Sequence, residues 1–162
     1  NIIQREYSQG HEIGSHSFSH PQITTLTSEE IEYQFTETEH RIQQYVPYTT
    51  KLIRPPYGQI TQSLKEVLQK TFVLWSIDTQ DWKTRDKDAI VSEVLNNVKD
   101  GDIILMHDMY STTADACEEL IPALIERGYQ LVTVSELLNA KEITPVAGSV
   151  YSRVLSTGNA AS

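Results

Sequence analysis

Two histidines near the start of the chain have a spacing typical of metal ligands. His16 and His20 lie four residues apart, so in one helical turn both imidazoles fall on the same face and can bind one cation. Pro21 bars a long helix, and we expect the pair in a loop or a single turn after a short strand at residues 11–15. Such pairs also arise by chance, so ordinary surface or core histidines remain the alternative at this point.

Polar residues also follow the other predicted strands, at the point where each strand ends. The predicted strands, which are short or continuous apolar runs, are residues 51–53, 72–77 and 102–106. The polar residues that follow them are Arg54, Asp78, Asp81 and His107. Because the carboxyl ends of parallel strands form one edge, where active sites are built, we expect these side chains to converge with the histidine pair.

Helices are predicted between the strands. A capping box at Thr27 and Glu30 opens a helix that Pro47 ends, while Thr61 and Asp86 cap two more. A further helix runs to about residue 127, and it is followed by a last strand at residues 130–134 and a closing helical turn at 135–138. This alternation predicts an α/β fold with a parallel sheet, either open or closed into a barrel.

Composition narrows the class of partner. The 162 residues carry a formal charge of -9 and no basic cluster, which argues against nucleic acid or an anionic membrane as partner. No apolar run approaches the ~20 residues of a membrane span. The single cysteine, Cys117, excludes an internal disulfide, and its apolar neighbours predict an inert core thiol.

The two ends of the chain differ from its middle. Residues 1–10 have the pattern of a helix entered part-way, without an N-cap, and this predicts that the chain is a fragment. From Lys141 onward large apolar residues are few, so residues 141–162 are predicted to be a tail that wraps an edge or is disordered.

Four segments, taken in order, resemble motifs of a known family. They are residues 16–20, 54–58, 78–82 and 105–107, and the set is similar to motifs two to five of the NodB-type polysaccharide deacetylases, carbohydrate esterase family four. The residues of these motifs are most similar to those of Gram-positive peptidoglycan N-acetylglucosamine deacetylases. The resemblance covers about residues 1–140, and it implies the C-terminal part of a catalytic domain with a distorted (β/α) barrel whose N-terminal strands are missing from this chain.

The resemblance implies metal-dependent hydrolysis of the N-acetyl group of N-acetylglucosamine residues in a glycan, with peptidoglycan as the favoured polymer. A water activated by Zn²⁺, or by Co²⁺ or another divalent ion, would attack the acetyl carbonyl. By resemblance His16 and His20 are metal ligands, and Arg54 holds the catalytic base. Chitooligosaccharides or other polysaccharides are alternative substrates, and another metallohydrolase on a similar barrel is an alternative activity.

The resemblance also assigns the remaining site residues. His107 maps to the general acid that protonates the departing amine, and Asp81 maps to the carboxylate that supports it. Tyr57, Trp82 and Leu105 would form the walls of the acetyl pocket. The resemblance assigns no definite role to Asp78. A site role and a purely structural bond from its carboxylate to a nearby loop backbone are equal alternatives.

The family's first motif, Thr-Phe-Asp-Asp-Gly-Pro, is absent from these residues. It supplies the base and the third metal ligand, so the resemblance implies a partner: an upstream segment of the same gene product that carries the Asp-Asp pair. The alternative from another functional class is a non-catalytic glycan-binding module of the same fold. The resemblance further implies an extracytoplasmic location, on the surface of or secreted from a Gram-positive-type bacterium.

Overall fold

The computed structural model describes residues 1–155, which divide into two compact units. Among the described residues, the first unit comprises Asn1–Leu74 and Thr144–Tyr151, and the second comprises Trp75–Ile143 and residues 152–155. Each unit has its own parallel strands and its own apolar core. The α/β class predicted from the sequence is confirmed, whereas closure into a barrel stays a prediction.

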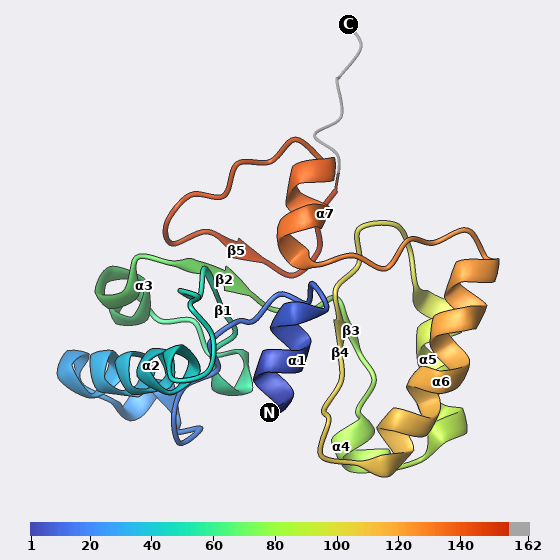
Figure 1. The fold of residues 1–162 in the computed structure, drawn as a ribbon, viewed down its shortest axis with the longest axis horizontal. Coiled ribbons are helices and arrows are strands. Elements are labelled where there is room, and N and C mark those ends of the chain that lie inside the picture. The colour runs from blue at the N-terminus through green and yellow to red at the C-terminus, as the bar shows by residue number, and fades with distance from the viewer. Residues whose placement is uncertain (156–162) are drawn as a thin grey trace, which may run out of the picture. The chain divides into compact units, whose positions relative to one another are not determined.

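The first unit is built on a parallel sheet in the order β1-β2-β5 (Figure 1). Its strands are β1 (Leu52–Ile53), β2 (Thr71–Val73) and β5 (Val150–Tyr151). The predicted strand at residues 11–15 is reduced to one parallel bridge between Ser15 and Ile53. This bridge places the residue before His16 beside the sheet.

Two helices of the first unit, α2 (Ser28–Gln43) and α3 (Gln62–Leu68), begin at the caps that the sequence predicts, Thr27 and Thr61. The unit also contains α1 (Ile2–Ser8) and the 3-10 turns η1 (Ile23–Thr25) and η2 (Pro56–Gly58). In the capping box of α2 the Thr27 hydroxyl accepts from the Glu30 N–H, and the Glu30 carboxylate accepts from the Thr27 N–H. Ile31 and Phe35 of α2 pack with Phe72 of β2 in the core of this unit.

The first helix has an N-cap that the sequence did not predict. Asn1 is the N-cap of α1, and its side chain accepts from the Ile3 N–H at 2.9 Å. Gln4 completes a capping box with Asn1.

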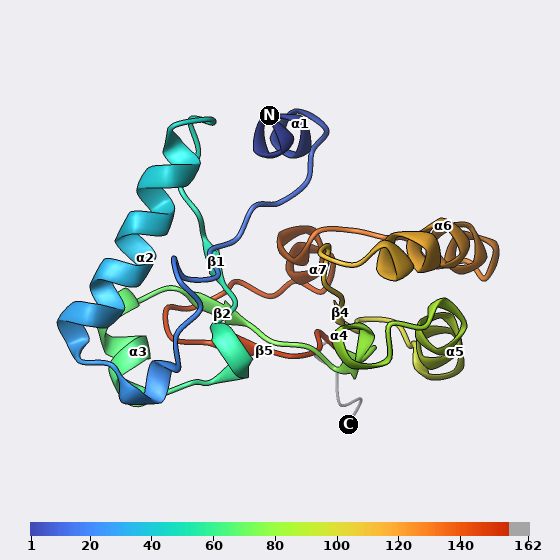
Figure 2. The ribbon, with the colours of Figure 1, turned by 90° about the horizontal axis from the view of Figure 1, so that it is seen from below.

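The second unit pairs two short parallel strands with helices. Its elements are β3 (Ile77–Asp78), β4 (Ile104–Leu105), α4 (Asp81–Thr84), α5 (Lys87–Asn97), α6 (Ser111–Glu126) and α7 (Val134–Ala140). Figure 2 shows α5 and α6 side by side, and Ile90 and Val94 of α5 pack with Leu120 of α6. The predicted cap of α5 is present, since the Asp86 carboxylate accepts from the Asp88 and Ala89 N–H groups.

Two predicted strands are wrong in extent or kind. The run 72–77 forms two strands, because the Leu74 N–H bonds to the carbonyl of Tyr151 whereas the Ser76 N–H bonds to that of Ile103. Residues 130–133 form no strand, and Thr133 instead caps α7 through a capping box with Glu136. An apolar run forms a strand only where a neighbouring strand is available for pairing, and composition does not show whether one is.

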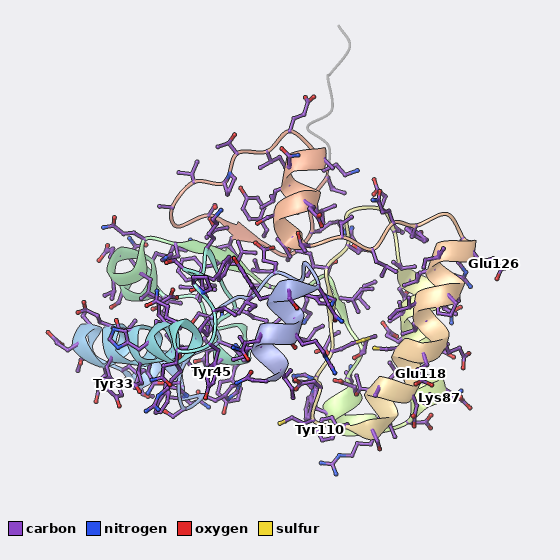
Figure 3. All side chains as sticks on the ribbon, viewed as in Figure 1. Tyr33, Tyr45, Lys87, Tyr110, Glu118 and Glu126 are labelled. Atoms are coloured by element: carbon purple, nitrogen blue, oxygen red, sulfur yellow. The ribbon has the colours of Figure 1, made fainter. Side chains whose placement is uncertain are left out.

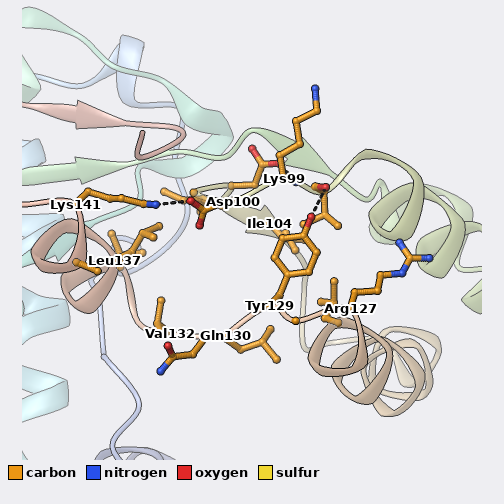
Figure 4. A pocket seen from close by; sticks show the side chains of 18 residues that line it. Lys99, Asp100, Ile104, Arg127, Tyr129, Gln130, Val132, Leu137 and Lys141 are labelled. Carbon is orange, nitrogen blue, oxygen red and sulfur yellow. Dashed lines mark hydrogen bonds and ion pairs between the residues drawn. The ribbon is translucent and has the colours of Figure 1, made fainter. Parts of the chain in front are cut away.

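Residues 130–132 line a pocket of about 620 Å³ within the second unit (Figure 4). Lys141, the C-cap of α7, and Asp100 form an ion pair in its lining, and the Tyr129 hydroxyl donates to the carbonyl of Val98 at 3.0 Å. No residue that the sequence assigns to the site lines this pocket.

The predicted tail, 141–162, contributes part of the fold. Its residues 144–151 belong to the first unit, where Val150 pairs opposite Phe72 of β2. The portion 156–162 lies outside the described residues. The predicted domain boundary at residue 140 stays a prediction. Along the described chain, no helix is both long and apolar enough to cross a bilayer.

Candidate active site

The histidine pair lies in a loop of the first unit. The ring centroids of His16 and His20 are 5.0 Å apart, and the rings stand at 76° to one another. The Nδ1–H of His16 donates to the carbonyl oxygen of Arg54 at 2.5 Å. Because a carbonyl can only accept, the proton is on Nδ1, and Nε2 carries the lone pair that a cation needs. A backbone carbonyl in this position is a common support for a metal-binding imidazole.

The backbone of this loop takes an uncommon conformation. Ser17 and His20 have φ values of 67° and 54°, in the left-handed region that side chains other than glycine rarely adopt. The Ser17 hydroxyl accepts from the N–H of His20 at 3.0 Å, which closes the turn. Local strain of this kind clusters at functional sites, where the surrounding structure enforces it.

Arg54 and Tyr57 follow β1 in the same unit. The Arg54 N–H donates to the carbonyl of Ser15 at 3.0 Å, so its backbone extends the bridge beside the histidine loop. Tyr57 lies in η2 with φ of 57°, and its ring centroid is 4.7 Å from that of His20. The structure therefore brings His16, His20, Tyr57 and the backbone of Arg54 together, while the predicted contact of Arg54 with a base stays a prediction.

A buried carboxylate organises the site residues of the second unit. Asp81, the first residue of α4, has no exposed surface. Its oxygens accept hydrogen bonds from His107 N (2.6 Å), His107 Nδ1 (2.7 Å), Thr113 Oγ1 (2.9 Å) and Trp82 N (2.9 Å). A buried carboxylate with this many donors is satisfied, as burial of a charge requires.

These bonds keep Asp81 ionised. Burial by itself would raise the pKa of Asp81, but hydrogen bonds from the side chain and backbone of His107 and from Thr113 together hold that pKa below its usual value. An ionised carboxylate can only accept, so His107 donates through Nδ1–H. The remaining ring nitrogen, Nε2, is then the atom with which His107 can exchange a proton with a substrate.

The other predicted site residues of this unit differ in exposure. Trp82 is 49% exposed, whereas Leu105 is 6% exposed and its carbonyl accepts from the buried Thr79 hydroxyl. Asp78 accepts from the N–H of Gln80 at 2.9 Å, a bond to a nearby loop backbone. Trp82 thus offers an exposed aromatic surface, while the Leu105 side chain is mostly buried.

Sequence reasoning missed Thr113, which donates to Asp81 from α6 and is itself buried. A threonine in a helix carries no local signal for this role, because the contact joins residues 32 positions apart in the chain. Cys117, also on α6, donates its thiol hydrogen to the sulfur of Met106 at 3.6 Å. Burial, and next the charge of Asp81, raise the pKa of the Cys117 thiol.

The imidazole nitrogens of His16 and His20 fit part of a metal site. Imidazole nitrogens suit zinc, cobalt and similar ions. Within residues 1–155 there is no cluster of three or more His, Cys, Asp or Glu that could hold a metal ion. The histidine pair therefore offers two ligands, and a complete site needs at least one more.

The chain is similar to proteins of one family. Residues 1–73 match the family described as Polysaccharide deacetylase. The peptidoglycan-N-acetylmuramic acid deacetylase PdaC of Bacillus subtilis is 44% identical over 138 residues, which cover 85% of this chain and 30% of PdaC. A peptidoglycan-N-acetylglucosamine deacetylase of Bacillus cereus is 35% identical, over 86% of this chain and 69% of that protein.

Solved structures show the same likeness. A family 4 acetyl xylan esterase from Clostridium thermocellum, in complex with a cobalt ion, superposes with a TM-score of 0.89 at 32% identity. The match covers 94% of this chain and 77% of the esterase chain. By contrast, the chain spans less than a third of the length of PdaC.

Proposed function

Because this chain belongs to the polysaccharide deacetylase family, we propose that it removes the N-acetyl group from N-acetylglucosamine residues of peptidoglycan. The observation that carries the proposal is the pair of Asp81 and His107, in which a buried, ionised carboxylate fixes the tautomer of a half-buried imidazole. This is the arrangement that a general acid for a departing amine needs.

His16 and His20 are proposed to hold a divalent ion through Nε2. The bond from His16 Nδ1 to the Arg54 carbonyl supports this assignment, and so does the cobalt ion in the Clostridium thermocellum esterase. When bound, such an ion polarises the acetyl carbonyl and lowers the pKa of water. We propose Zn²⁺ as the native ion, and an upstream Asp-Asp segment as the source of the third ligand and the base.

His107 is proposed to deliver the proton that the leaving amine requires. Asp81 holds Nδ1–H, so the transferred proton resides on Nε2. Thr113 acts on Asp81 and not on the substrate, because its hydroxyl donates to the carboxylate. The bond from Nδ1–H to Asp81 keeps the ring oriented before and after the transfer.

The remaining site residues are proposed to shape the pocket. Trp82 and Tyr57 are 49% and 58% exposed, and aromatic surfaces of this kind suit the apolar faces of a sugar ring. Leu105 would contribute the small part of its surface that is not buried. Arg54 is proposed to hold the base by a charge-assisted pair.

Both Bacillus relatives are named for peptidoglycan, one for its N-acetylmuramic acid and one for its N-acetylglucosamine. This shared polymer supports peptidoglycan over chitooligosaccharide. An extracytoplasmic location, at the surface of or secreted from a Gram-positive-type bacterium, follows as a proposal because peptidoglycan lies outside the membrane. Mass spectrometry of digested peptidoglycan will identify the deacetylated sugar, and deacetylated muramic acid alone would contradict the proposed substrate.

Metal content and acetate release together test the proposal. The complete gene product, loaded with Zn²⁺, should release acetate from purified peptidoglycan. A His16→Ala, His20→Ala double variant should lose metal and activity together, because both imidazole ligands are gone. If the double variant retains the metal content of wild type, the metal assignment is wrong.

A further inference from the structure

One side chain ties the loop of the histidine pair to helix α2. The side-chain oxygen of Gln34 accepts from the N–H of Phe18 at 3.0 Å and from that of Ser19 at 2.8 Å. Its side-chain NH₂ donates to the hydroxyl of Ser19 at 2.9 Å. Both ends of the Gln34 amide are therefore bonded to the two residues that lie between Ser17 and His20.

The conformation of this loop needs such support. Ser17 and His20 both have positive φ, a strained conformation that persists only where other contacts enforce it. The bond from His20 N–H to the Ser17 hydroxyl closes the turn internally. Gln34 holds the turn from outside. Its own position is fixed because the next residue of α2, Phe35, is buried in the core.

Aromatic contacts with α2 reinforce the same attachment. The ring of Phe18 meets that of Tyr33 edge to face at 6.4 Å, and the Arg41 guanidinium lies 5.7 Å from the Phe18 centroid. Figure 3 shows Tyr33 on α2. These contacts hold the side chain of Phe18, whereas Gln34 holds the backbone that sets the direction of both imidazoles.

We propose that Gln34 is a positioning residue for the metal ligands His16 and His20. Its amide keeps the loop in the conformation that sets the two rings 5.0 Å apart, so that both nitrogens reach one ion without reorganisation. The proposal rests on the proposed function in that a divalent cation is the ligand of the pair.

Two substitutions of Gln34 separate positioning from general stability. Gln34→Leu removes the acceptor and the donor while keeping a good helix former. Gln34→Glu keeps an acceptor for both N–H groups, and the Ser19 hydroxyl can rotate to donate to it. Gln43→Leu is the matched control, because Gln43 is an exposed glutamine of α2 whose amide bonds to Glu39 and Thr49 instead.

The complete protein is studied by circular dichroism, by amide hydrogen exchange without metal, and by titration with Co²⁺ followed through its visible absorption. Gln34→Leu should speed amide exchange at Phe18 and Ser19. It should also weaken Co²⁺ binding by ~10–100-fold, the usual scale for a group that supports a metal ligand, and change the cobalt absorption spectrum. Gln34→Glu should restore affinity and spectrum, and Gln43→Leu should leave both unchanged.

The outcomes distinguish the two proposals. Wild-type affinity and spectrum in Gln34→Leu would overturn the role of Gln34 alone, and so would a Gln34→Glu variant as weak as Gln34→Leu. Failure of wild type to bind Co²⁺ would overturn the metal site of the proposed function, and the positioning of ligands with it.

Discussion

At the scale of single residues, the second unit concentrates its chemistry on one buried carboxylate. Asp81 could be predicted as the partner of His107 only through family resemblance, because the two residues are 26 positions apart. Thr113 and Gln34 could not be predicted at all. Each acts through a tertiary hydrogen bond, and neither residue type signals such a bond in its local sequence.

The proposed acid role of His107 gives a kinetic expectation. His107→Asn should lower kcat by ~10²–10⁴-fold, the usual scale for a proton-transfer residue, while metal content stays at the wild-type level. Steady-state kinetics on a soluble N-acetylated glycan and metal analysis of the same sample check it. Unchanged kcat would remove His107 from the role of acid.

The lowered pKa of Asp81 predicts how stability depends on pH. Because the folded-state pKa lies below the unfolded value of ~3.9, the ionised form contributes stability that is present above about pH 4 and lost as pH falls through the folded pKa. Asp81→Asn should therefore flatten the acid limb of the unfolding free energy, measured by urea denaturation between pH 2 and pH 7.

A second acid and one control variant frame that experiment. Asp102 is a second acid whose pKa is lowered, by Ser76, Lys99 and Arg153 against the effect of burial, so part of the acid limb should persist in Asp81→Asn. Asp115→Asn, at an exposed position of α6, should leave the limb as in wild type. An acid limb identical in Asp81→Asn and wild type would contradict the stabilising role of this carboxylate.

At the scale of elements, helix starts were predictable and strand limits were not. Thr27, Thr61 and Asp86 each cap the helix that the sequence assigned to them, because a cap bonds to a backbone group two or three residues away. The run 72–77 divides between two strands and the run 130–134 forms none, because pairing depends on partners far along the chain.

The turn before β4 offers a test at this scale. Gly101 has φ of 87°, and a Cβ there would lie 1.9 Å from the carbonyl oxygen of Val154. Gly128 has φ of 85°, but nothing lies within 4 Å of its Cβ position. Gly128→Ala should cost only the backbone strain of about 1–2 kcal/mol, whereas Gly101→Ala should cost clearly more because the backbone of Val154 must also move.

Thermal unfolding of the two alanine variants checks this expectation. A common loss of Tm in both would show that the contact with Val154 adds nothing to the strain at Gly101. A larger loss in Gly101→Ala would show that the turn before β4 is held against Val154, whose N–H donates to the Gly101 carbonyl at 2.8 Å.

At the scale of the whole molecule, the residues that the sequence assigns to the site fall in two compact units. His16, His20, Arg54 and Tyr57 fall in the first, and Asp81, Trp82, Leu105 and His107 fall in the second. The α/β class could be predicted from the alternation of strands and helices, and the family from the order of the motifs. The division into units could not, since the run that passes from one unit to the other, residues 72–77, has uniformly apolar composition.

The chain by itself should be incomplete as an enzyme. Residues 1–155 present no three-ligand metal cluster, so we expect the 162 residues alone neither to hold Zn²⁺ tightly nor to release acetate. The complete gene product should do both. Isothermal titration and an acetate assay on the two proteins check this, and full activity of the isolated chain would contradict an upstream source of the base.

The same pair of proteins decides between an enzyme and a glycan-binding module. A complete gene product that binds peptidoglycan fragments without releasing acetate would favour the non-catalytic alternative. Loss of that binding in Trp82→Ala would then locate the glycan on the second unit.

Cys117, the single cysteine of the chain, can report on the packing of α6. Cys117 is protonated and bonded to Met106, so a thiol-specific alkylating reagent will react slowly while α6 stays packed against the segment that follows β4. The alkylation rate therefore measures how often this helix separates from the segment after β4 that carries Met106 and His107. No label needs to be introduced, and the motion can be timed in the unaltered protein while substrate or metal is added.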